Sequence, residues 1–297
     1  MNTNIALMMK ETSSIYKTKM LGIVTLYNPD PMEVVNNIKR YIDDVDTLII
    51  WDNSPLEVML KQQILDHLTE IHRIIWHGDG KNHCIAPAIN YAWHYAEEND
   101  FQSLLLMDQD SEWIDFSAYR KEVETLMEDS NPAVYTPYVN GTDQFAITSM
   151  IQTKRLFINS GAIIPTVILG AIGGIDEICF PLDAIDHDMA YSISERGYKI
   201  ICLTSHHLNH SLGEPQRMGL FHIFTPNYNS FRTYSMTRSH IICYRKHRQL
   251  MTKEDKDYLY REIIYRKFCR IILAEPEKIR RMIALIKGII NGYRYKI

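Results

Sequence analysis

Cysteine is scarce in this sequence and does not occur in close pairs. The five cysteines are Cys84, Cys179, Cys202, Cys243 and Cys269. Their wide spacing provides no Cys-x-x-Cys motif of the kind found in zinc sites, and their odd number argues against a disulfide framework. We therefore expect reduced thiols, as in a cytoplasmic protein.

An excess of positive charge and a long hydrophobic run are also lacking. The net charge is −4, so no overall basic field indicates a nucleic-acid partner. Residues 1–19 contain no apolar core of the kind a signal peptide requires. The most apolar stretch, Phe157–Gly174, is interrupted by Asn159 and Pro165 and is too broken to cross a bilayer. We expect a soluble chain, cytoplasmic or peripheral at the inner face of the cell membrane.

A glycine-rich phosphate loop is absent as well. The sequence has no Gly-x-Gly-x-x-Gly motif, which argues against a Rossmann dehydrogenase. A sugar nucleotidyltransferase would need a glycine-rich loop after its first strand. This chain has Thr25-Leu26-Tyr27-Asn28-Pro29 at that place. A nucleotidyltransferase is therefore kept only as an alternative function.

What the N-terminal half does contain is an alternation of strand-like and helix-like segments. Short apolar runs ending in turn residues predict strands at Leu21–Tyr27, Thr47–Trp51, Arg73–Trp76 and Ser103–Met107. Helical spacing follows the first run, and Ala86–Glu98 predicts a helix whose alanines pack closely on a sheet. This order predicts an α/β fold with a largely parallel central sheet and flanking helices.

The second half is less regular. Further strands are predicted at Ala133–Tyr138, Ser149–Gln152, Gly161–Pro165 and Lys199–Leu203, and helices at Asp115–Glu128 and Ala184–Arg196. We expect an N-terminal tail at 1–19, a catalytic domain at 20–225 and a basic, helical C-terminal extension at 226–297.

Polar residues follow three of the predicted strands at their carboxyl ends. These residues are Asn28, Asp52 and Asp108. Asn and Asp are ordinary turn formers, so one such position would carry no information. Three of them at one edge of an open parallel sheet favour a ligand site, because ligands bind outside the carboxyl ends of the strands.

The triplet Asp108-Gln109-Asp110 places two carboxylates at the end of a predicted buried strand. Mg²⁺ and Mn²⁺ take oxygen ligands and share their coordination with substrate phosphates. Asp-x-Asp alone is frequent by chance, and Asp44-Val45-Asp46 is another example in this chain. The position after the strand is what indicates a metal and nucleotide site. Asp52 has two open interpretations, as a hydrogen-bond acceptor for a pyrimidine ring N–H or as a cap of a helix near Leu56.

Three acids, Asp183, Asp186 and Asp188, lie at the start of the predicted helix Ala184–Arg196. Asp183 as N-cap with Asp186 at the third position resembles a capping box. Asp186 is also a candidate general base, because it needs only to be ionised and within reach of an acceptor hydroxyl. Both interpretations are compatible.

A histidine cluster and a basic tail complete the candidate features. His206, His207 and His210 are open to interpretation as a zinc site or as structural residues, with His210 as an extra Mn²⁺ ligand. Residues 265–297 hold nine Lys/Arg and two Glu, a local charge of +7. Within them lies an apolar stripe of Met282, Ile283, Leu285, Ile286 and Ile289. We expect this stripe to pack on the catalytic domain; contact with an anionic membrane surface is the alternative.

These motifs together resemble family 2 glycosyltransferases of the GT-A fold, and most closely the bacterial rhamnosyltransferase group. The resemblance covers about 21–247. It rests on seven segments in the same order as in that family: Val24–Pro29, Trp51–Ser54, Asn82–Asn90, Leu106–Ser111, Asn159–Ala162, Phe180–Asp188 and Asn209–Gly213, with Tyr234–His247 similar to the Arg- and Tyr-rich segment that follows.

The resemblance implies an inverting, metal-dependent hexosyltransferase that uses Mg²⁺ or Mn²⁺ and a TDP- or UDP-linked sugar. The acceptor would be a glycan or lipid-linked glycan in surface polysaccharide synthesis, and a homo-oligomer is possible for such a chain. The implied donor-site residues are Thr25, Asn28, Asp52, Asn82, Asn90 and Asp108. Asp110 and His210 would hold the metal, Asp186 would be the catalytic base, and Asp188, Ser160 and Gly161 would support it and the acceptor.

The chain departs from the family pattern at several places. Leu26 lengthens the usual Val-Thr-Tyr-Asn-Pro by one residue, Cys84 and Ala92 replace common glycines, and Ser192 replaces a usual arginine. Rhamnose is therefore not assumed as the sugar. A non-catalytic nucleotide- or carbohydrate-binding relative is a further alternative, against which the presence of Asp108, Asp110 and Asp186 together argues.

Overall fold

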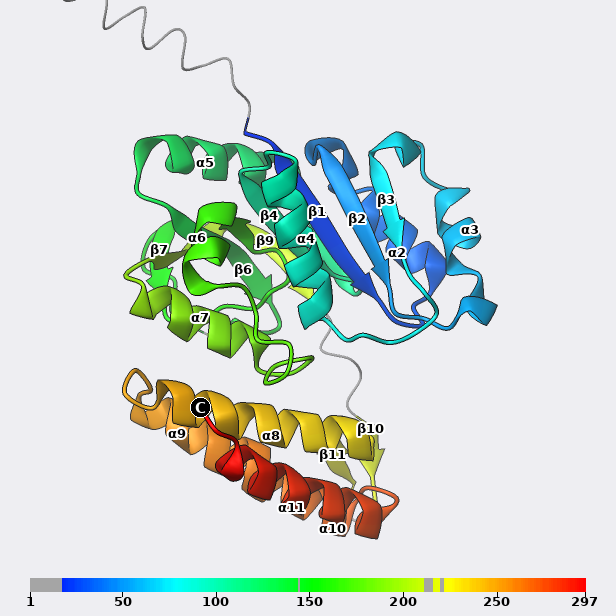
Figure 1. Cartoon of the computed structure of the whole chain (residues 1–297), viewed down its shortest axis with the longest axis vertical. Helices are drawn as coiled ribbons and strands as arrows, with labels where there is room; N and C mark the ends of the chain where they lie inside the picture. The colour runs from blue at the N-terminus through cyan, green and yellow to red at the C-terminus, as the bar shows by residue number, and fades with distance from the viewer. Residues whose placement is uncertain (1–17, 144, 211–215, 220–221) are drawn as a thin grey trace, which may run out of the picture.

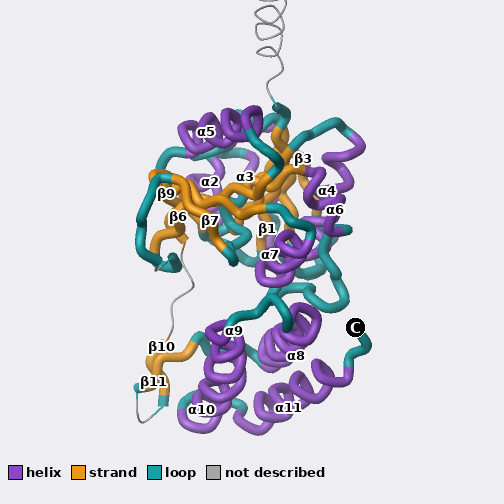
Figure 2. The backbone as a smooth tube through the Cα atoms, turned by 90° about the vertical axis from the view of Figure 1, so that its left-hand side faces the viewer, coloured by secondary structure: helices purple, strands orange, loops and turns teal. Residues whose placement is uncertain are grey.

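The computed structural model describes residues 18–143, 145–210, 216–219 and 222–297 (Figure 1). The expected tail at 1–19 therefore lies outside the described residues except for Thr18 and Lys19. Within the described ranges, a twisted sheet flanked by helices is followed by a group of C-terminal helices that lies along one side of it (Figures 1 and 2).

One nine-stranded sheet forms the centre of the described chain, with the path β3-β2-β1-β4-β8-β6-β9-β5 and with β7 paired to β9. Its strands are β1 (Met20–Leu26), β2 (Thr47–Asp52), β3 (Ile74–His77), β4 (Ser103–Asp108), β5 (Ser111–Trp113), β6 (Ala133–Asn140), β7 (Ile151–Lys154), β8 (Ile163–Pro165) and β9 (Lys199–His210). The first four strands are mutually parallel, as predicted, whereas β8 joins β4 in the antiparallel direction. The sheet is therefore mixed and mostly parallel in its N-terminal half.

Helices cover both faces of the sheet, because the strands of a parallel sheet are apolar on both sides. One apolar cluster packs α4 (Ala86–Glu98), α6 (Thr166–Ile172) and α7 (Ile185–Glu195) on one face. The other cluster packs α2 (Pro31–Ile38), α3 (Leu60–Leu65) and α5 (Phe116–Asp129) on the opposite face. Single turns at η1 (Ile42–Asp44), η2 (Leu56–Val58) and η3 (Ile71–Arg73) join these elements.

Local sequence explains where several helices begin. Asp30 accepts hydrogen bonds from two backbone N–H groups at the start of α2, and Pro31 occupies its first position. Asp115 caps α5 through the N–H of Ala118. In α4 the side chains of Ala88, Ala92 and Ala96 are fully buried, which confirms their predicted close packing on the sheet.

The capping box expected at α7 does not form. The helix begins at Ile185, its N-cap is Ala184 in a left-handed conformation with φ 64°, and no side chain caps it. Asp183 instead faces Arg232, at 3.5 Å from the guanidinium Nε. The strand predicted at Lys199–Leu203 is also longer than expected, since β9 continues to His210.

The C-terminal elements lie beyond a short hairpin of β10 (Gln216–Met218) and β11 (Ile223–Thr225). They are α8 (Ser230–His247), α9 (Lys253–Tyr258), the π-helical turn η4 (Leu259–Arg266), α10 (Lys267–Leu273) and α11 (Lys278–Arg294). Helix α8 lies next to α7, and Ser239 donates a hydrogen bond to the carbonyl of Cys179 at 2.7 Å. The buried carboxylate of Glu275 pairs with Lys267 and Arg281, which ties α10 to α11.

Candidate functional site

Three strands bring the predicted polar residues to one edge of the sheet. In the parallel register of β1 with its two neighbours, Thr25 pairs with Asp108 and Leu26 pairs with Asp52. The carboxyl ends of β1, β2 and β4 therefore lie side by side, and Asn28 follows β1 in a left-handed conformation with φ 47°. This is the edge at which open α/β sheets bind ligands.

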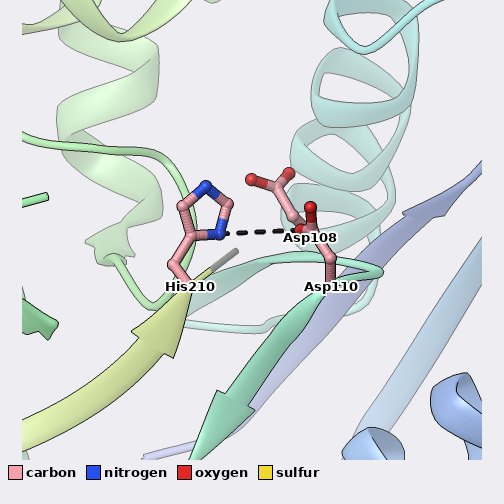
Figure 3. Close-up of side chains that lie close together, drawn as sticks. All are labelled: Asp108, Asp110 and His210. Carbon is pink, nitrogen blue, oxygen red and sulfur yellow. Dashed lines mark ion pairs between the residues drawn. The ribbon is translucent and has the colours of Figure 1, made fainter. Parts of the chain in front are cut away.

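Asp108, Asp110 and His210 form a compact group at this edge (Figure 3). One ligand atom of each residue lies within 4.8 Å of those of the other two, and Nδ1 of His210 is 3.6 Å from a carboxylate oxygen of Asp110. The group forms because β5 pairs antiparallel with β9, with Ser111 opposite His210. That pairing brings the end of β9 next to the Asp-Gln-Asp turn, although about 100 residues separate them.

A chain of hydrogen bonds lies behind this group. The backbone N–H of Asp108 donates to the hydroxyl of Ser160 at 3.1 Å, and that hydroxyl donates to Ser111 at 2.7 Å. The Ser111 hydroxyl is in turn 2.8 Å from Nδ1 of His210. Both serines are fully buried. They fix the His210 ring and the Asp108 backbone relative to one another, as outer residues of metal sites do.

The electrostatics of the group favour a bound cation. The pKa of Asp108 is raised to about 6, mainly by burial; His210 opposes this shift, and Asp110 and Asp186 contribute to it. Burial also raises the pKa of Asp110. Carboxylates whose pKa is raised in this way lack a compensating positive charge, and a divalent cation would supply it. Two carboxylates and an imidazole are donors that suit Mn²⁺, so the residues present fit a metal.

Gln109, between the two aspartates, was not identified from the sequence as a functional residue. Its side-chain oxygen accepts the N–H of Tyr27 at 2.7 Å, and its carbonyl accepts a hydrogen bond from Asn37 at 3.0 Å. The triplet is thereby anchored to the loop after β1 and to α2. No sequence signal indicated this role, because the contacts join segments far apart in the chain.

Asp52 ends β2 in a tight turn. One of its carboxylate oxygens accepts the N–H of Ser54 at 2.8 Å, and Ser54 accepts the N–H of Asn28 at 2.8 Å. The carboxylate therefore closes a local turn and does not cap a regular helix, since the following turn has Pro55 as its N-cap. Gly78 approaches closely, because a Cβ there would lie 2.9 Å from the Asp52 carbonyl oxygen.

An aromatic cluster that the sequence did not reveal lies next to Asp52. The rings of Trp51 and His77 are stacked with centroids 4.0 Å apart, and the ring of Tyr91 lies 4.8 Å from that of His77. His77 ends β3 and Tyr91 belongs to α4, so the cluster bridges two elements. The partly exposed rings of His77 and Tyr91 provide flat surfaces beside the strand ends, whereas Trp51 is buried.

The two asparagines predicted for the donor site hold backbone turns. Asn82 accepts the N–H of Cys84 at 2.8 Å. Asn90 binds both the N–H and the carbonyl of Ile175 and also donates to Glu177 at 2.8 Å. Its amide thus joins α4 to the loop after α6. Their roles toward a donor stay predictions.

Asp186 lies in the first turn of α7. Its negative charge contributes to the raised pKa of Asp108. Asp188 is buried and points to α8: its carboxylate binds Lys246 and His247, each at 2.8 Å. His247 in turn contacts Glu195 at 3.0 Å. The structure therefore shows Asp188 as a link between α7 and α8, and its support of Asp186 stays a prediction.

Gly161 and two of the clustered histidines have structural explanations. Gly161 has φ +80°, and a Cβ there would meet Pro137 and Leu208 at 2.9 Å. His206 pairs with Glu122 at 2.7 Å, and His207 contacts Asn140 at 3.0 Å. Of the three histidines, His210 alone joins the group in Figure 3. The segment Ser211–Gly213 of the predicted motif lies outside the described residues.

Two cavities adjoin these residues. One of about 780 Å³ is lined by Glu33, Asn36, Asn37, Asp110, Glu112, Asn140, Gly141, Asn209 and His210. The other, of about 340 Å³, lies among α7, α8 and α9 and is mainly apolar. His187, which follows Asp186, lines it together with His240 and Tyr258. Burial lowers the pKa of His240 to about 4.

No protein-family model matches this sequence, and no curated protein matches it. Solved structures do match the fold. GalNAc-T7 with UDP, GalNAc and Mn²⁺ superposes with a TM-score of 0.62 and 10% identity, over 94% of this chain and 56% of that one. The chain thus spans little more than half the length of GalNAc-T7.

Two further structures are similar over most of their own length. The mannosyltransferase PcManGT from Pyrobaculum calidifontis, with GDP-Man and Mn²⁺, has a TM-score of 0.57 and 11% identity, covering 95% of this chain and 77% of its own. TarS 1-349 from S. aureus, with UDP-GlcNAc, has a TM-score of 0.52 and 14% identity, covering 91% and 81%. The expected GT-A fold is therefore confirmed.

Across the described residues, no helix is long and apolar enough to cross a membrane. This agrees with the absence of a long hydrophobic run in the sequence.

Proposed function

We propose that this protein is an inverting, metal-dependent glycosyltransferase that moves a sugar from a TDP- or UDP-linked donor to a glycan or lipid-linked acceptor in surface polysaccharide synthesis. The observation that carries the proposal is the Asp108, Asp110 and His210 group at the carboxyl edge of a GT-A sheet. The effect of Asp186 on the pKa of Asp108 supports a location of the candidate base near these ligands.

The donor nucleoside is proposed to bind beside Asp52. One oxygen of that carboxylate accepts the Ser54 N–H, and the described residues provide no hydrogen bond to the other. A free carboxylate oxygen can accept the ring N–H of uracil or thymine. The rings of His77 and Tyr91 next to it suit stacking of a base. Thr25 and Asn28, at the end of β1, border the same edge.

Asp110 and His210 are proposed to hold a divalent cation, with Asp108 on the nucleotide side. When bound, a cation at this place offsets the negative charge that develops on a departing nucleoside diphosphate. Neighbouring residues hold these ligands in position. Ser111 and Ser160 fix the His210 ring and the Asp108 backbone, and Gln109 anchors the triplet to Tyr27.

Asp186 is proposed as the general base. It takes the proton of the acceptor hydroxyl while the acceptor oxygen forms a bond to the anomeric carbon and the bond to the diphosphate oxygen breaks. Attack opposite the leaving group inverts the anomeric configuration, and no covalent bond to the enzyme is needed. The apolar cavity bordered by His187, His240 and Tyr258 suits the acceptor, because Asp186 acts on the pKa of both His240 and Tyr258.

A calorimetric donor screen tests the proposal. UDP-, TDP- and GDP-linked sugars are titrated into the wild type with and without Mn²⁺, and into Asp110→Asn. We expect Mn²⁺-dependent binding of a pyrimidine donor that Asp110→Asn weakens by about 10–100-fold. Glu128→Gln, at an exposed position on α5, is the matched control and should bind as the wild type does. If no nucleoside diphosphate sugar binds under any condition, the proposed function is wrong.

A further inference from the structure

Helix α11 has two opposite faces of different character. Its inward face packs on α8 through small residues: a Cβ added to Gly288 would lie 2.9 Å from Thr237 and from the Tyr234 carbonyl, and one added to Gly292 would lie 2.8 Å from Ile241. Ala284 and Leu285 are also buried on this face. The stripe predicted at 282–289 therefore packs only in part, and it packs on α8 and not on the expected catalytic domain. Leu285 is fully buried, Met282 and Ile289 are half-buried, and small residues make the closest contacts.

The outward face of α11 is apolar as well. Of the isoleucines expected to pack inward, Ile289 is partly buried against a small cluster on α8 and η4, whereas Ile283 and Ile286 are exposed. These two belong to a row whose side chains are between 42% and 77% exposed: Ile279, Ile283, Ile286, Ile290 and Tyr293. Successive members are four, three, four and three residues apart, so they form one stripe along the helix. We call this stripe the isoleucine ridge. It lies on the side of α11 opposite the inward face that contains Gly288 and Gly292.

The apolar surface continues onto the neighbouring elements. Exposed large apolar side chains on η4 and α10 are Tyr265, Phe268, Ile272 and Leu273. The two surfaces adjoin, because the hydroxyls of Tyr260 and Tyr293 are 3.3 Å apart and Lys278 donates to the carbonyl of Ile272 at 2.6 Å. In Figures 1 and 2, α10 and α11 lie on the side of α8 that faces away from the sheet.

Cations flank the isoleucine ridge. At 100° per residue, Lys287 and Arg294 lie on one side of it and Lys278 on the other. In the part of the chain that the structure describes, no carboxylate pairs with any of these three. The two acids of this segment are occupied, since Glu275 is buried with Lys267 and Arg281, and Glu277 pairs with Arg280.

A continuous apolar surface of this kind is a binding surface in most proteins, because water contact with aligned isoleucines is unfavourable. The cations beside the ridge distinguish two candidate partners, a second copy of the chain and an anionic bilayer. A second copy of the chain would bring the same cations together, whereas an anionic bilayer presents opposite charge above an apolar layer. We propose that the isoleucine ridge lies on an anionic lipid surface, with the isoleucines at the boundary of headgroups and acyl chains. This proposal does not depend on the proposed catalytic function.

Vesicle co-sedimentation of the full chain tests the proposal without nucleotide or acceptor. The probes are vesicles of phosphatidylcholine with phosphatidylglycerol and vesicles of phosphatidylcholine alone. We expect binding to the anionic vesicles that weakens as salt is raised. Ile283→Gln/Ile286→Gln should bind roughly tenfold more weakly or worse, and Lys287→Gln about fivefold more weakly.

The matched control is Ile71→Gln/Val167→Gln, which replaces two exposed apolar side chains on the sheet domain and should bind as the wild type does. Circular dichroism melting checks that each variant is folded, and Lys287→Gln keeps the apolar packing unchanged. Equal binding of the wild type and the ridge variants, or no binding to anionic vesicles, overturns the proposal. So does a dimer in light scattering that Ile283→Gln/Ile286→Gln converts to a monomer while vesicles stay unbound.

Discussion

At the scale of single residues, Asp186 and Asp188 lie two positions apart on α7 and have different surroundings. Asp186 raises the pKa of Asp108, whereas Asp188 binds Lys246 and His247 on α8. Asp186→Asn keeps the shape of the side chain but removes its ability to take a proton. We expect donor turnover to fall by about 10²–10⁴-fold with donor affinity unchanged. The measurement is release of nucleoside diphosphate, with affinity from calorimetry.

Asp188→Asn is the companion variant to Asp186→Asn. It leaves Lys246 and His247 without their carboxylate, so we expect a loss of about 1–3 kcal/mol in the free energy of unfolding. Turnover should change far less than in Asp186→Asn. If Asp186→Asn retained full turnover, Asp186 would be only part of the helix terminus.

Asp183 gives a pH-dependent prediction for stability. Burial raises its pKa from 3.8 to about 6, Arg232 opposes the shift, and Asp186 adds to it. The folded state thus holds the proton more tightly than the unfolded state, so this residue destabilises the fold above pH 6 and ceases to do so as pH falls toward 4. Asp183→Asn should raise the free energy of unfolding by on the order of 2 kcal/mol at neutral pH.

Urea unfolding of the wild type and Asp183→Asn across this pH range measures that difference. The gap between the two proteins should close as pH approaches the ordinary pKa of 3.8. A gap that is constant with pH, or absent at neutral pH, would show that folding does not raise the pKa of Asp183.

At the scale of secondary structure, the contact of α11 with α8 depends on the absence of side chains. Gly288→Ala adds a Cβ that meets Thr237 and a backbone carbonyl at 2.9 Å. Alanine favours a helix by about 1 kcal/mol over glycine, but the displacement of α11 should outweigh this and leave a net loss of about 1–2 kcal/mol. Ile290→Ala, on the exposed ridge, should change the stability by less than about 0.5 kcal/mol. Thermal unfolding of both variants checks this, and equal stability changes would contradict the contact.

Some helices and strands could be predicted from sequence patterns and others could not. Apolar runs such as Leu104–Leu106 predicted the first four strands to within one or two residues, because buried parallel strands are apolar on both faces. The polar end of β9, Ser205–His210, was missed, because pairing with β5 and β6 stabilises it and its residues have no strand pattern. Ile283 and Ile286 were wrongly assigned to the packed face of α11, because hydropathy does not show that two glycines permit a closer contact than isoleucines do.

The candidate site likewise has features that the sequence predicts and features that it does not. The positions of Asp52, Asp108 and Asp110 were predictable, since each directly follows an apolar run. The Ser160–Ser111–His210 chain was not, because it joins three elements through the pairing of β5 with β9. The aromatic rings of His77 and Tyr91 were likewise invisible in the sequence, as they come from a strand and a helix that meet only in the fold.

At the scale of the whole molecule, the sheet carries Asp108, Asp110 and His210, α7 carries the candidate base Asp186, and α11 carries the isoleucine ridge. The proposed nucleotide site and the proposed lipid-facing surface therefore lie on different parts of one chain (Figure 1). Such an arrangement suits an enzyme with a water-soluble donor and an acceptor held at a membrane.

Anomalous diffraction from crystals grown with Mn²⁺ and UDP or TDP tests the central claim most directly. We expect one manganese peak bound by Asp110 and His210, with the nucleotide diphosphate against it and the base beside Asp52. Crystals of Asp110→Asn under the same conditions should lose the peak. Manganese at another place, or a nucleotide bound away from the carboxyl edge of β1, β2 and β4, would contradict the account.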